Sequence, residues 1–338
     1  MRDVFSQSSR SHITSLVHEK LPVMHKAFPV MKIFFRHASV AMLLALLISA
    51  CNTIEIREES AFDAHRTITP ERFDVPGFTL HEQTVVTSDG EHLDSWFLEH
   101  EEARATVLYL GGNGFLMVKS RPLIEAYAKA GVNLLLFDYR GYGMSSGSPS
   151  VDGLKKDVAS AFDAAVNTFA ARAGGHAGGH AGGHAGGHNK DAHTANDIHP
   201  ENTHPVFIHG HSMGSLLAGW LAERNRVNGY VLESPISNVS DWTGGLVPFL
   251  LKPFIRFDID PVLAREDNIA RVANIRSPLL IIAGERDEIT PVRMAETLFD
   301  ASGSASKQKI LIPGGGHNDL PEHELYAEAL RSFFAQGL

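Results

Sequence analysis

A serine stands at the centre of the pentapeptide Gly-His-Ser-Met-Gly at residues 210–214. The apolar residues 206–209 predict a buried strand before it, and residues 215–224 predict a helix with one apolar side after it. A serine on such a strand-to-helix turn, with a glycine two residues away on each side, adopts a strained backbone that exposes its hydroxyl. Ser212 is therefore the candidate nucleophile. The amide of Met213, at the helix N-terminus, is a candidate donor to an oxyanion.

A serine needs a base to take its proton, and the base needs an acid to orient it. When the serine lies on a strand-to-helix turn of this type, the acid follows it along the chain, and the histidine follows the acid. A predicted strand that ends at residue 283 leads into a loop containing Asp287, with Glu288 and Glu285 as competitors. We favour Asp287 because an acid a few residues past the strand can turn back under a histidine.

The candidate base is His317, which follows the last predicted strand, residues 309–312. The chain has 19 histidines, so a histidine by itself is a weak signal. This one is preceded by three glycines at residues 314–316, which let the loop fold so that the imidazole reaches across the sheet edge. Its place between strand, glycine loop and following helix indicates the general base of the site.

A second oxyanion donor is expected from the loop Gly-Gly-Asn-Gly-Phe at residues 111–115, which follows a predicted strand over 105–110. Glycines allow backbone amides to approach a substrate closely. We assign the amide of Asn113, with Gly112 as the alternative, and we expect Gly112 and His211 to contact the substrate. An ordinary glycine turn is the competing interpretation.

These residues require a sheet that brings several strand ends together. Residues 84–87 and 92–98 predict a hairpin, and from residue 105 onward predicted strands alternate with predicted helices. This alternation indicates a parallel sheet with helices on both faces. Residues 237–270 hold more apolar side chains than a solvated loop should, which indicates a helical cap with Trp242 contacting the substrate. The alternative is that these aromatic side chains only fill the core.

The N-terminal part carries the features of a secretory signal: a basic start near residue 31, an apolar run over 38–48, and small residues before Cys51. The sequence Leu-Ile-Ser-Ala-Cys that ends there resembles the lipobox of bacterial lipoproteins, which implies that Cys51 carries acyl groups. We therefore expect a signal peptide and extension over 1–50, an anchor spacer over 51–82, and a lipid-anchored protein facing the periplasm or cell exterior, on the outer membrane if there are two. A plain signal peptide or an uncleaved anchor is the alternative.

Charge and composition exclude some classes of partner. The net charge of the 338 residues is −9, and the first fifty residues carry +4, which leaves −13 for the rest. Such an acidic body lacks the basic surface that nucleic acid requires. Residues 174–204 form a His/Gly-rich insertion that starts with an AGGH repeat and that we expect to be disordered. Repeat expansion without a role is favoured over metal chelation, so we expect no metal site.

The sequence Asp-Tyr-Arg-Gly-Tyr-Gly-Met-Ser at residues 138–145 resembles the D-x-R-G-x-G-x-S loop of α/β-hydrolases. The serine pentapeptide and the loops around Asn113, Asp287 and His317 resemble that family in the same order, from about residue 83 to the C-terminus. The similarity is greatest to the serine-aminopeptidase-like or monoacylglycerol-lipase-like branch.

The resemblance implies an α/β-hydrolase domain over 83–338: a mostly parallel eight-stranded sheet, helices on both faces and a small helical cap. It implies hydrolysis of an ester, thioester or amide of a small acyl substrate through an acyl-enzyme, without a cofactor and as a monomer. Gly111 departs from the family, which usually has histidine there, and the AGGH insertion is foreign to it. A non-catalytic binding protein of this fold and a metal-scavenging surface lipoprotein are the alternatives.

Overall fold

The computed structural model describes residues 52–66, 76–174 and 204–336, which belong to one compact unit. The predicted signal peptide, Cys51 and most of the AGGH insertion lie outside the described residues. The unit is built on eight strands: β2 (Phe78–Val86), β3 (His92–His100), β4 (Thr106–Leu110), β5 (Asn133–Phe137), β6 (Val206–His211), β7 (Gly229–Glu233), β9 (Leu279–Gly284) and β10 (Lys307–Ile312).

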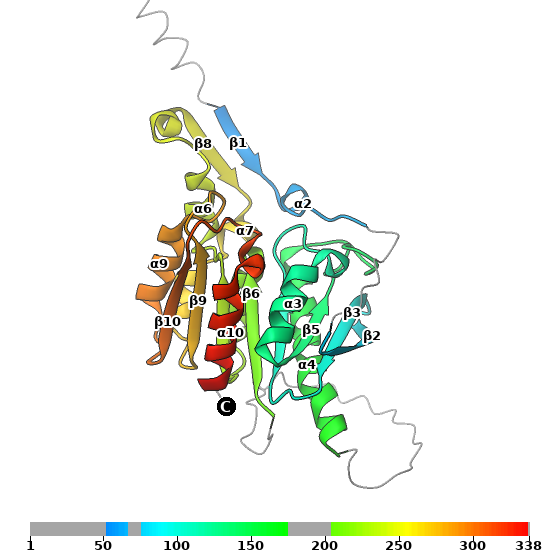
Figure 1. Cartoon of the computed structure of the whole chain (residues 1–338). Helices are drawn as coiled ribbons and strands as arrows, with labels where there is room; N and C mark the ends of the chain where they lie inside the picture. The colour runs from blue at the N-terminus through cyan, green and yellow to red at the C-terminus, as the bar shows by residue number, and fades with distance from the viewer. Residues whose placement is uncertain (1–51, 67–75, 175–203, 337–338) are drawn as a thin grey trace, which may run out of the picture. The chain divides into compact units, whose positions relative to one another are not determined.

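These strands form one sheet in the order β10-β9-β7-β6-β4-β5-β3-β2 (Figure 1). Strand β3 pairs antiparallel with β2 and β5, and the other five pairings are parallel. Every residue of β4, β5, β6, β7 and β9 is buried, as expected for parallel strands covered on both faces. The predicted mostly parallel eight-stranded sheet is confirmed.

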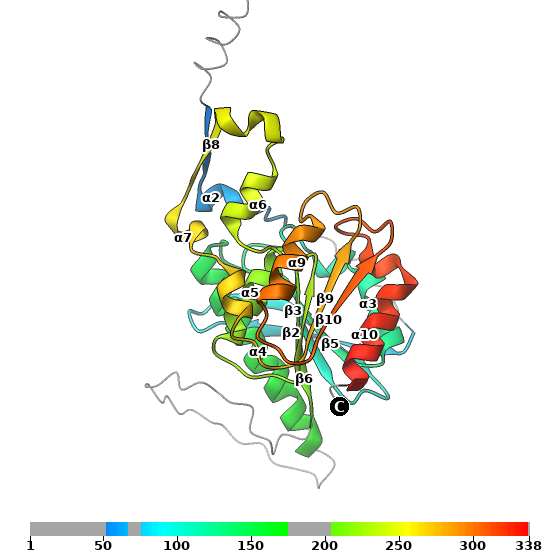
Figure 2. The ribbon, with the colours of Figure 1, turned by 90° about the vertical axis from the view of Figure 1, so that its left-hand side faces the viewer.

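Helices cover both faces of the sheet, as predicted. Figure 2 shows α3 and α10 on one side of the sheet and α4, α5 and α9 on the other. Within the described ranges each helix is too short or too polar to cross a lipid bilayer. The bounds of these helices are α3 (Arg121–Ala130), α4 (Val151–Gly174), α5 (Met213–Ala222), α9 (Val292–Ala301) and α10 (Glu324–Gln336).

The cap between β7 and β9 is not purely helical as predicted, because it contains a strand. That strand pairs in parallel with β1, which precedes the main sheet in the sequence, and Asn52 lies opposite Ile255 in the register. The spacer expected over 51–82 therefore contains folded elements. The elements of the cap and of the N-terminal segment are β1 (Asn52–Ile56), α2 (Glu58–Ala61), α6 (Val239–Gly245), η2 (Phe249–Phe254), β8 (Ile255–Ile259), α7 (Pro261–Ala264) and α8 (Asn268–Val272).

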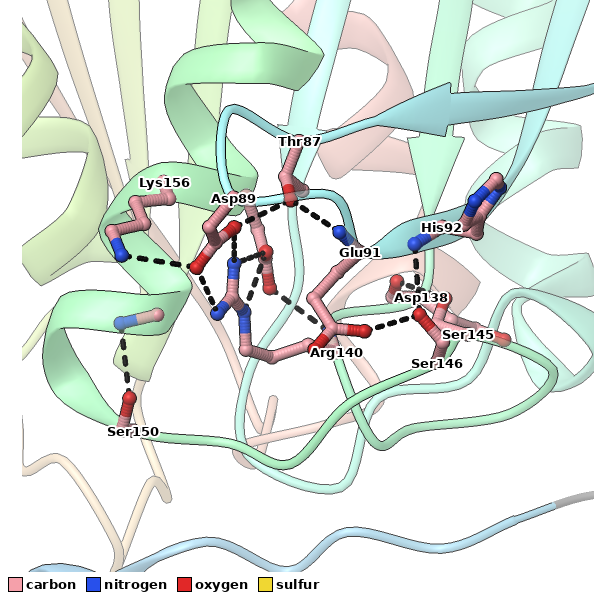
Figure 3. A network of polar contacts seen from close by, with 12 residues as sticks. Thr87, Asp89, Glu91, His92, Asp138, Arg140, Ser145, Ser146, Ser150 and Lys156 are labelled. Atoms are coloured by element: carbon pink, nitrogen blue, oxygen red, sulfur yellow. Dashed lines mark hydrogen bonds and ion pairs between the residues drawn. The ribbon is translucent and has the colours of Figure 1, made fainter.

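The loop at residues 138–145, which carries the D-x-R-G-x-G-x-S sequence, connects neighbouring elements through a network of polar contacts (Figure 3). The guanidinium of Arg140 donates to both carboxylate oxygens of Asp89 at 3.0 Å and to Asp157 at 2.8 Å. These contacts join the β2–β3 turn, the loop and α4. Burial raises the pKa of Asp138 to about 7, although the Met117 amide donates to its Oδ1 at 2.8 Å. The polar residues Asp138 and Arg140 of this loop therefore have a structural role.

Candidate active site

The backbone at Ser212 is strained, as the sequence predicts. The residue lies between β6 and α5 with φ 52° and ψ −116°, in a region that non-glycine residues rarely occupy. Its amide donates to the carbonyl oxygen of Glu233 at 2.9 Å, which fixes the turn against the next strand. The hydroxyl is thereby held at the carboxyl edge of the sheet, at the N-terminus of a helix.

The two flanking glycines are required because the backbone around them is crowded. A Cβ atom added at Gly214 would lie 2.0 Å from the carbonyl oxygen of Leu110. A Cβ atom at Gly210 would lie 2.4 Å from the carbonyl oxygen of Gly214. Either side chain would force the strand and the helix apart, so the spacing of the pentapeptide follows from packing.

The structure brings together the three side chains that the sequence indicated. The Ser212 hydroxyl lies 2.9 Å from Nε2 of His317, and Nδ1 of His317 lies 2.8 Å from Oδ2 of Asp287. The serine precedes α5, the aspartate follows β9 and the histidine follows β10, so each comes from the carboxyl end of a strand. This is the arrangement in which a histidine can take a proton from a serine while a carboxylate orients it.

The competing acids do not take this position. Glu285 is exposed and accepts a hydrogen bond from the Gly314 amide at 3.0 Å, and Glu288 is exposed as well. Burial raises the pKa of Asp287, but hydrogen bonds from His317 and from Thr290 outweigh it and lower the pKa to about 2. Asp287 is therefore ionised at neutral pH, as an acid that orients an imidazole must be.

Thr290, which the sequence analysis did not single out, contacts both partners of the serine. Its Oγ1 lies 2.8 Å from Oδ2 of Asp287, 3.1 Å from Nδ1 of His317, and 3.0 Å from the carbonyl oxygen of Ser234. A hydroxyl has one proton and two lone pairs, so Thr290 can donate to one acceptor while accepting from Nδ1. The hydroxyl thus helps to hold the imidazole against the carboxylate.

Replacing Thr290 with valine is expected to lower kcat by about 10- to 100-fold, since a buried hydrogen-bonding group loses its partner. The KM should change little, because Thr290 does not line the cavity described below. Steady-state hydrolysis of a soluble ester measures both constants. Thr290→Ser, which keeps the hydroxyl, should restore most of kcat, and equal losses in the two variants would contradict the positioning role.

The predicted oxyanion loop lies against the nucleophile. A Cβ atom at Gly112 would lie 3.1 Å from Cβ of Ser212 and 2.9 Å from Nδ1 of His211, so a side chain there would have to displace one of these two residues. Gly112 and Asn113 line the same cavity as Ser212, and both of their amides remain candidates as donors. The amide of Met213 begins α5, where amides lack a partner inside the helix.

The side chain of Asn113 fixes this loop to the N-terminal segment. Its Oδ1 accepts from the Asp63 amide and from the Tyr142 hydroxyl, both at 2.8 Å, and its Nδ2 donates to the Ala61 carbonyl oxygen at 3.0 Å. At Gly111, where the family resemblance led us to expect a histidine, an added Cβ atom would lie 2.3 Å from the ring of Phe115. That ring leaves no room for a side chain at residue 111.

A cavity of about 310 Å³ opens beside Ser212 and His317 and is lined mainly by apolar side chains. His211 and Trp242, both expected to contact the substrate, lie in its wall. Burial lowers the pKa of His211, and its Nε2 donates to the carbonyl oxygen of His317 at 3.0 Å. The remaining apolar wall includes residues the sequence analysis did not name: Ile56, Ala61, Phe62, Leu216, Val239, Leu263 and Ile289.

A second cavity, of about 420 Å³, is lined by the predicted oxyanion loop and shares Gly112, Asn113, His211 and Asn318 with the first. Its wall is more polar and includes Lys119 and Glu322. In the part of the chain that the structure describes, no group of three or more histidine, cysteine, aspartate or glutamate side chains is placed to hold a metal ion.

Comparison with known proteins identifies the family to which this fold belongs. Sequence models of the α/β-hydrolase fold and of the serine aminopeptidase family S33 match residues 106–259 and 251–324. The chain belongs to the α/β-hydrolase family. It is 31% identical to the uncharacterized protein YfhR of Salmonella typhi over 278 residues, which covers 75% of this chain and 81% of YfhR.

Two further proteins show the extent of the similarity. The uncharacterized protein Rv2307c of Mycobacterium tuberculosis is 28% identical over 256 residues, which covers 75% of this chain and 78% of Rv2307c. The esterase Pf2001 of Pyrococcus furiosus has a similar fold, with a TM-score of 0.57 and 18% identity over 81% of this chain and 98% of the esterase.

Proposed function

We propose that the protein is a serine hydrolase that cleaves a carboxylic ester through an acyl-enzyme. The observation that carries the proposal is the pair of contacts from Ser212 to His317 and from His317 to Asp287, at 2.9 and 2.8 Å, on a strained turn beside an apolar cavity. A nucleophile, a base and an orienting acid are the groups that acyl transfer needs, so no cofactor is required.

In the first half of the reaction Ser212 attacks the acyl carbonyl while His317 takes its proton. The tetrahedral oxyanion accepts hydrogen bonds from the Met213 amide and from the amide of Asn113 or Gly112. When the intermediate collapses, His317 donates its proton to the leaving oxygen and the acyl group stays on Ser212. Water then attacks with the same base, and the carboxylic acid and free serine are released. Asp287 stays ionised throughout and stabilises the imidazolium.

The apolar cavity, which has Ser212 and His317 in its wall, suits an acyl chain. An aminopeptidase would need an unpaired carboxylate for the substrate ammonium. Glu266 lines the apolar cavity, but its oxygens lie 2.7 Å from Lys155 Nζ and 2.6 Å from an Arg271 nitrogen. Within the apolar cavity this pairing favours an apolar acyl group over an aminoacyl group.

The substrate class can be tested with p-nitrophenyl esters of increasing acyl length, measured beside aminoacyl p-nitroanilides. Each methylene that enters the cavity should raise kcat/KM by up to about fourfold until the cavity is filled, because burying a methylene contributes about 0.8 kcal/mol. The anilides should be hydrolysed far more slowly. A preference for acetyl esters, or faster cleavage of the anilides, would contradict this assignment.

We also propose that Cys51 carries a lipid anchor that holds the protein on a bacterial membrane, facing the periplasm or the cell exterior. The lipobox-like residues 47–51 support this proposal. A cysteine that carries two or more acyl chains anchors a protein stably to a membrane, whereas a single chain does not. Cys51→Ser should move most of the protein from the membrane pellet to the soluble fraction and abolish labelling with a palmitate analogue. Ser212→Ala is the control that keeps the anchor, and an unchanged membrane fraction for Cys51→Ser would count against the proposal.

A further inference from the structure

Large apolar side chains are exposed on β1 and on the segment 246–251 that leads into β8. Leu250 is 79% exposed, Leu246 52%, Leu251 45% and Ile54 42%. Two of these leucines lie in η2, which leads directly into β8, and Ile54 lies in β1, which pairs with β8. Figures 1 and 2 both show the coil before β8 beside the start of β1. We call these four residues the cap edge.

An apolar strip connects the cap edge to the active-site cavity. Along β8, Ile255, Phe257 and Ile259 are half-buried while the residues between them are exposed, so the apolar side chains share one face of the ribbon. The parallel register places Ile54 beside Phe257 and Ile56 beside Ile259. Ile56 lines the cavity next to Ser212, so the strip runs from the cavity outward to the cap edge.

The cap edge lies next to the start of β1, and this position in the chain indicates what kind of surface the cap edge contacts. β1 begins at Asn52, opposite Ile255, and Asn52 directly follows Cys51, the proposed site of the lipid anchor. The exposed leucines therefore lie close to the point where the proposed anchor joins the folded unit. Leucines exposed in such a group are a typical surface for contact with lipid.

We propose that the cap edge docks onto the surface of a lipid bilayer and that the strip leads acyl chains from the bilayer to Ser212. The delivery of substrate rests on the proposed hydrolase function, whereas the lipid contact does not. From residue 51 onward the chain carries a net charge of −13, which repels anionic lipid. Docking is therefore driven by apolar contact, is weakly dependent on salt, and needs no anionic lipid.

The single cysteine of the chain makes the contact measurable in the full-length protein. In a Cys51→Ser background, Leu250→Cys provides one thiol for an environment-sensitive NBD label. Glu102→Cys, in the exposed loop before β4 at the opposite edge of the sheet, is the control. With phosphatidylcholine vesicles, emission from position 250 should shift to the blue and rise by at least about twofold, at low and high salt, while position 102 stays unchanged.

Three results would overturn the lipid contact. One is an unchanged signal at position 250. Another is an equal change at positions 250 and 102. The third is a change at position 250 that depends on protein concentration without vesicles, which would identify a second copy of the chain as the occupant.

Substrate delivery is tested with two substrates: a soluble short-chain ester and a long-chain ester embedded in phosphatidylcholine vesicles. The double variant Leu250→Ser, Leu251→Ser should hydrolyse the soluble ester within about twofold of wild type, and the embedded ester at least about tenfold more slowly. The control variant Met144→Ser, Leu325→Ser removes two exposed apolar side chains elsewhere and should match wild type on both.

The outcomes separate the two proposals. Equal losses on both substrates, or an unchanged rate on the embedded ester, overturn delivery along the strip. If the wild type hydrolyses neither ester, the hydrolase function fails, and the NBD measurement still decides the lipid contact on its own.

Discussion

Replacing Ser212 with alanine is expected to lower kcat for ester hydrolysis by about 10⁴- to 10⁶-fold, which leaves at most the rate supplied by binding and the oxyanion donors. In the proposed mechanism the Ser212 hydroxyl oxygen bonds to the acyl carbon, and alanine offers no group that could do so. The hydrogen-bonded position of this hydroxyl, 2.9 Å from His317, is the reason for expecting so large an effect. The measurement is kcat on a p-nitrophenyl ester, with the melting temperature recorded to show that the variant folds.

The matched control for this experiment is Ser240→Ala, which removes an exposed serine hydroxyl from the cap. It should keep kcat within about twofold of wild type, because an exposed hydroxyl away from the nucleophile contributes nothing to acyl transfer. A Ser212→Ala protein that retained more than a few per cent of the wild-type rate would exclude this serine as the nucleophile.

Replacing Asp287 with asparagine is expected to lower kcat by about 10⁴-fold, the loss seen when the acid of a serine–histidine pair is neutralised with its geometry intact. Asparagine can donate to Nδ1 of His317, which would place the imidazole proton on Nε2 and leave no lone pair for the serine proton. The carboxylate also compensates the charge of the imidazolium, and its pKa of about 2 shows how strongly its surroundings favour the ionised form.

Glu288→Gln and Glu285→Gln are the controls for the aspartate, since both side chains are exposed in the same loop. Each should keep kcat within about twofold of wild type, because neither contacts the histidine. A larger loss in Glu288→Gln than in Asp287→Asn would transfer the role of the acid to the glutamate.

The sequence was sufficient to predict the sheet and the residues that converge on the serine, for a physical reason. Parallel strands have their carboxyl ends at one edge, so residues that follow successive strands meet there however far apart they lie in the chain. The glycines at residues 210, 214 and 314–316 indicated where the backbone passes too close to its neighbours, or bends too sharply, for a side chain. The family resemblance added the order in which the acid and the histidine follow Ser212.

The sequence was not sufficient to predict the wall of the cavity. Ile56 alternates with polar residues in β1, but its pairing partner, β8, lies in the cap, and local patterns do not report such distant pairings. The hydroxyl of Thr290 stands three residues after Asp287, yet only the folded loop shows that it reaches Nδ1 of His317. The side chain of Asn113 was likewise not foreseen as the link between the oxyanion loop and the N-terminal segment.

The most direct test of the serine hydrolase assignment is to treat the full-length protein with a fluorophosphonate and to locate the adduct by peptide mass spectrometry. Such reagents phosphonylate a serine only when a base activates its hydroxyl. We predict one adduct, on the peptide that contains Ser212, and its loss in Ser212→Ala. The absence of an adduct, or an adduct on another residue while Ser212 stays unmodified, would contradict the proposed catalytic site.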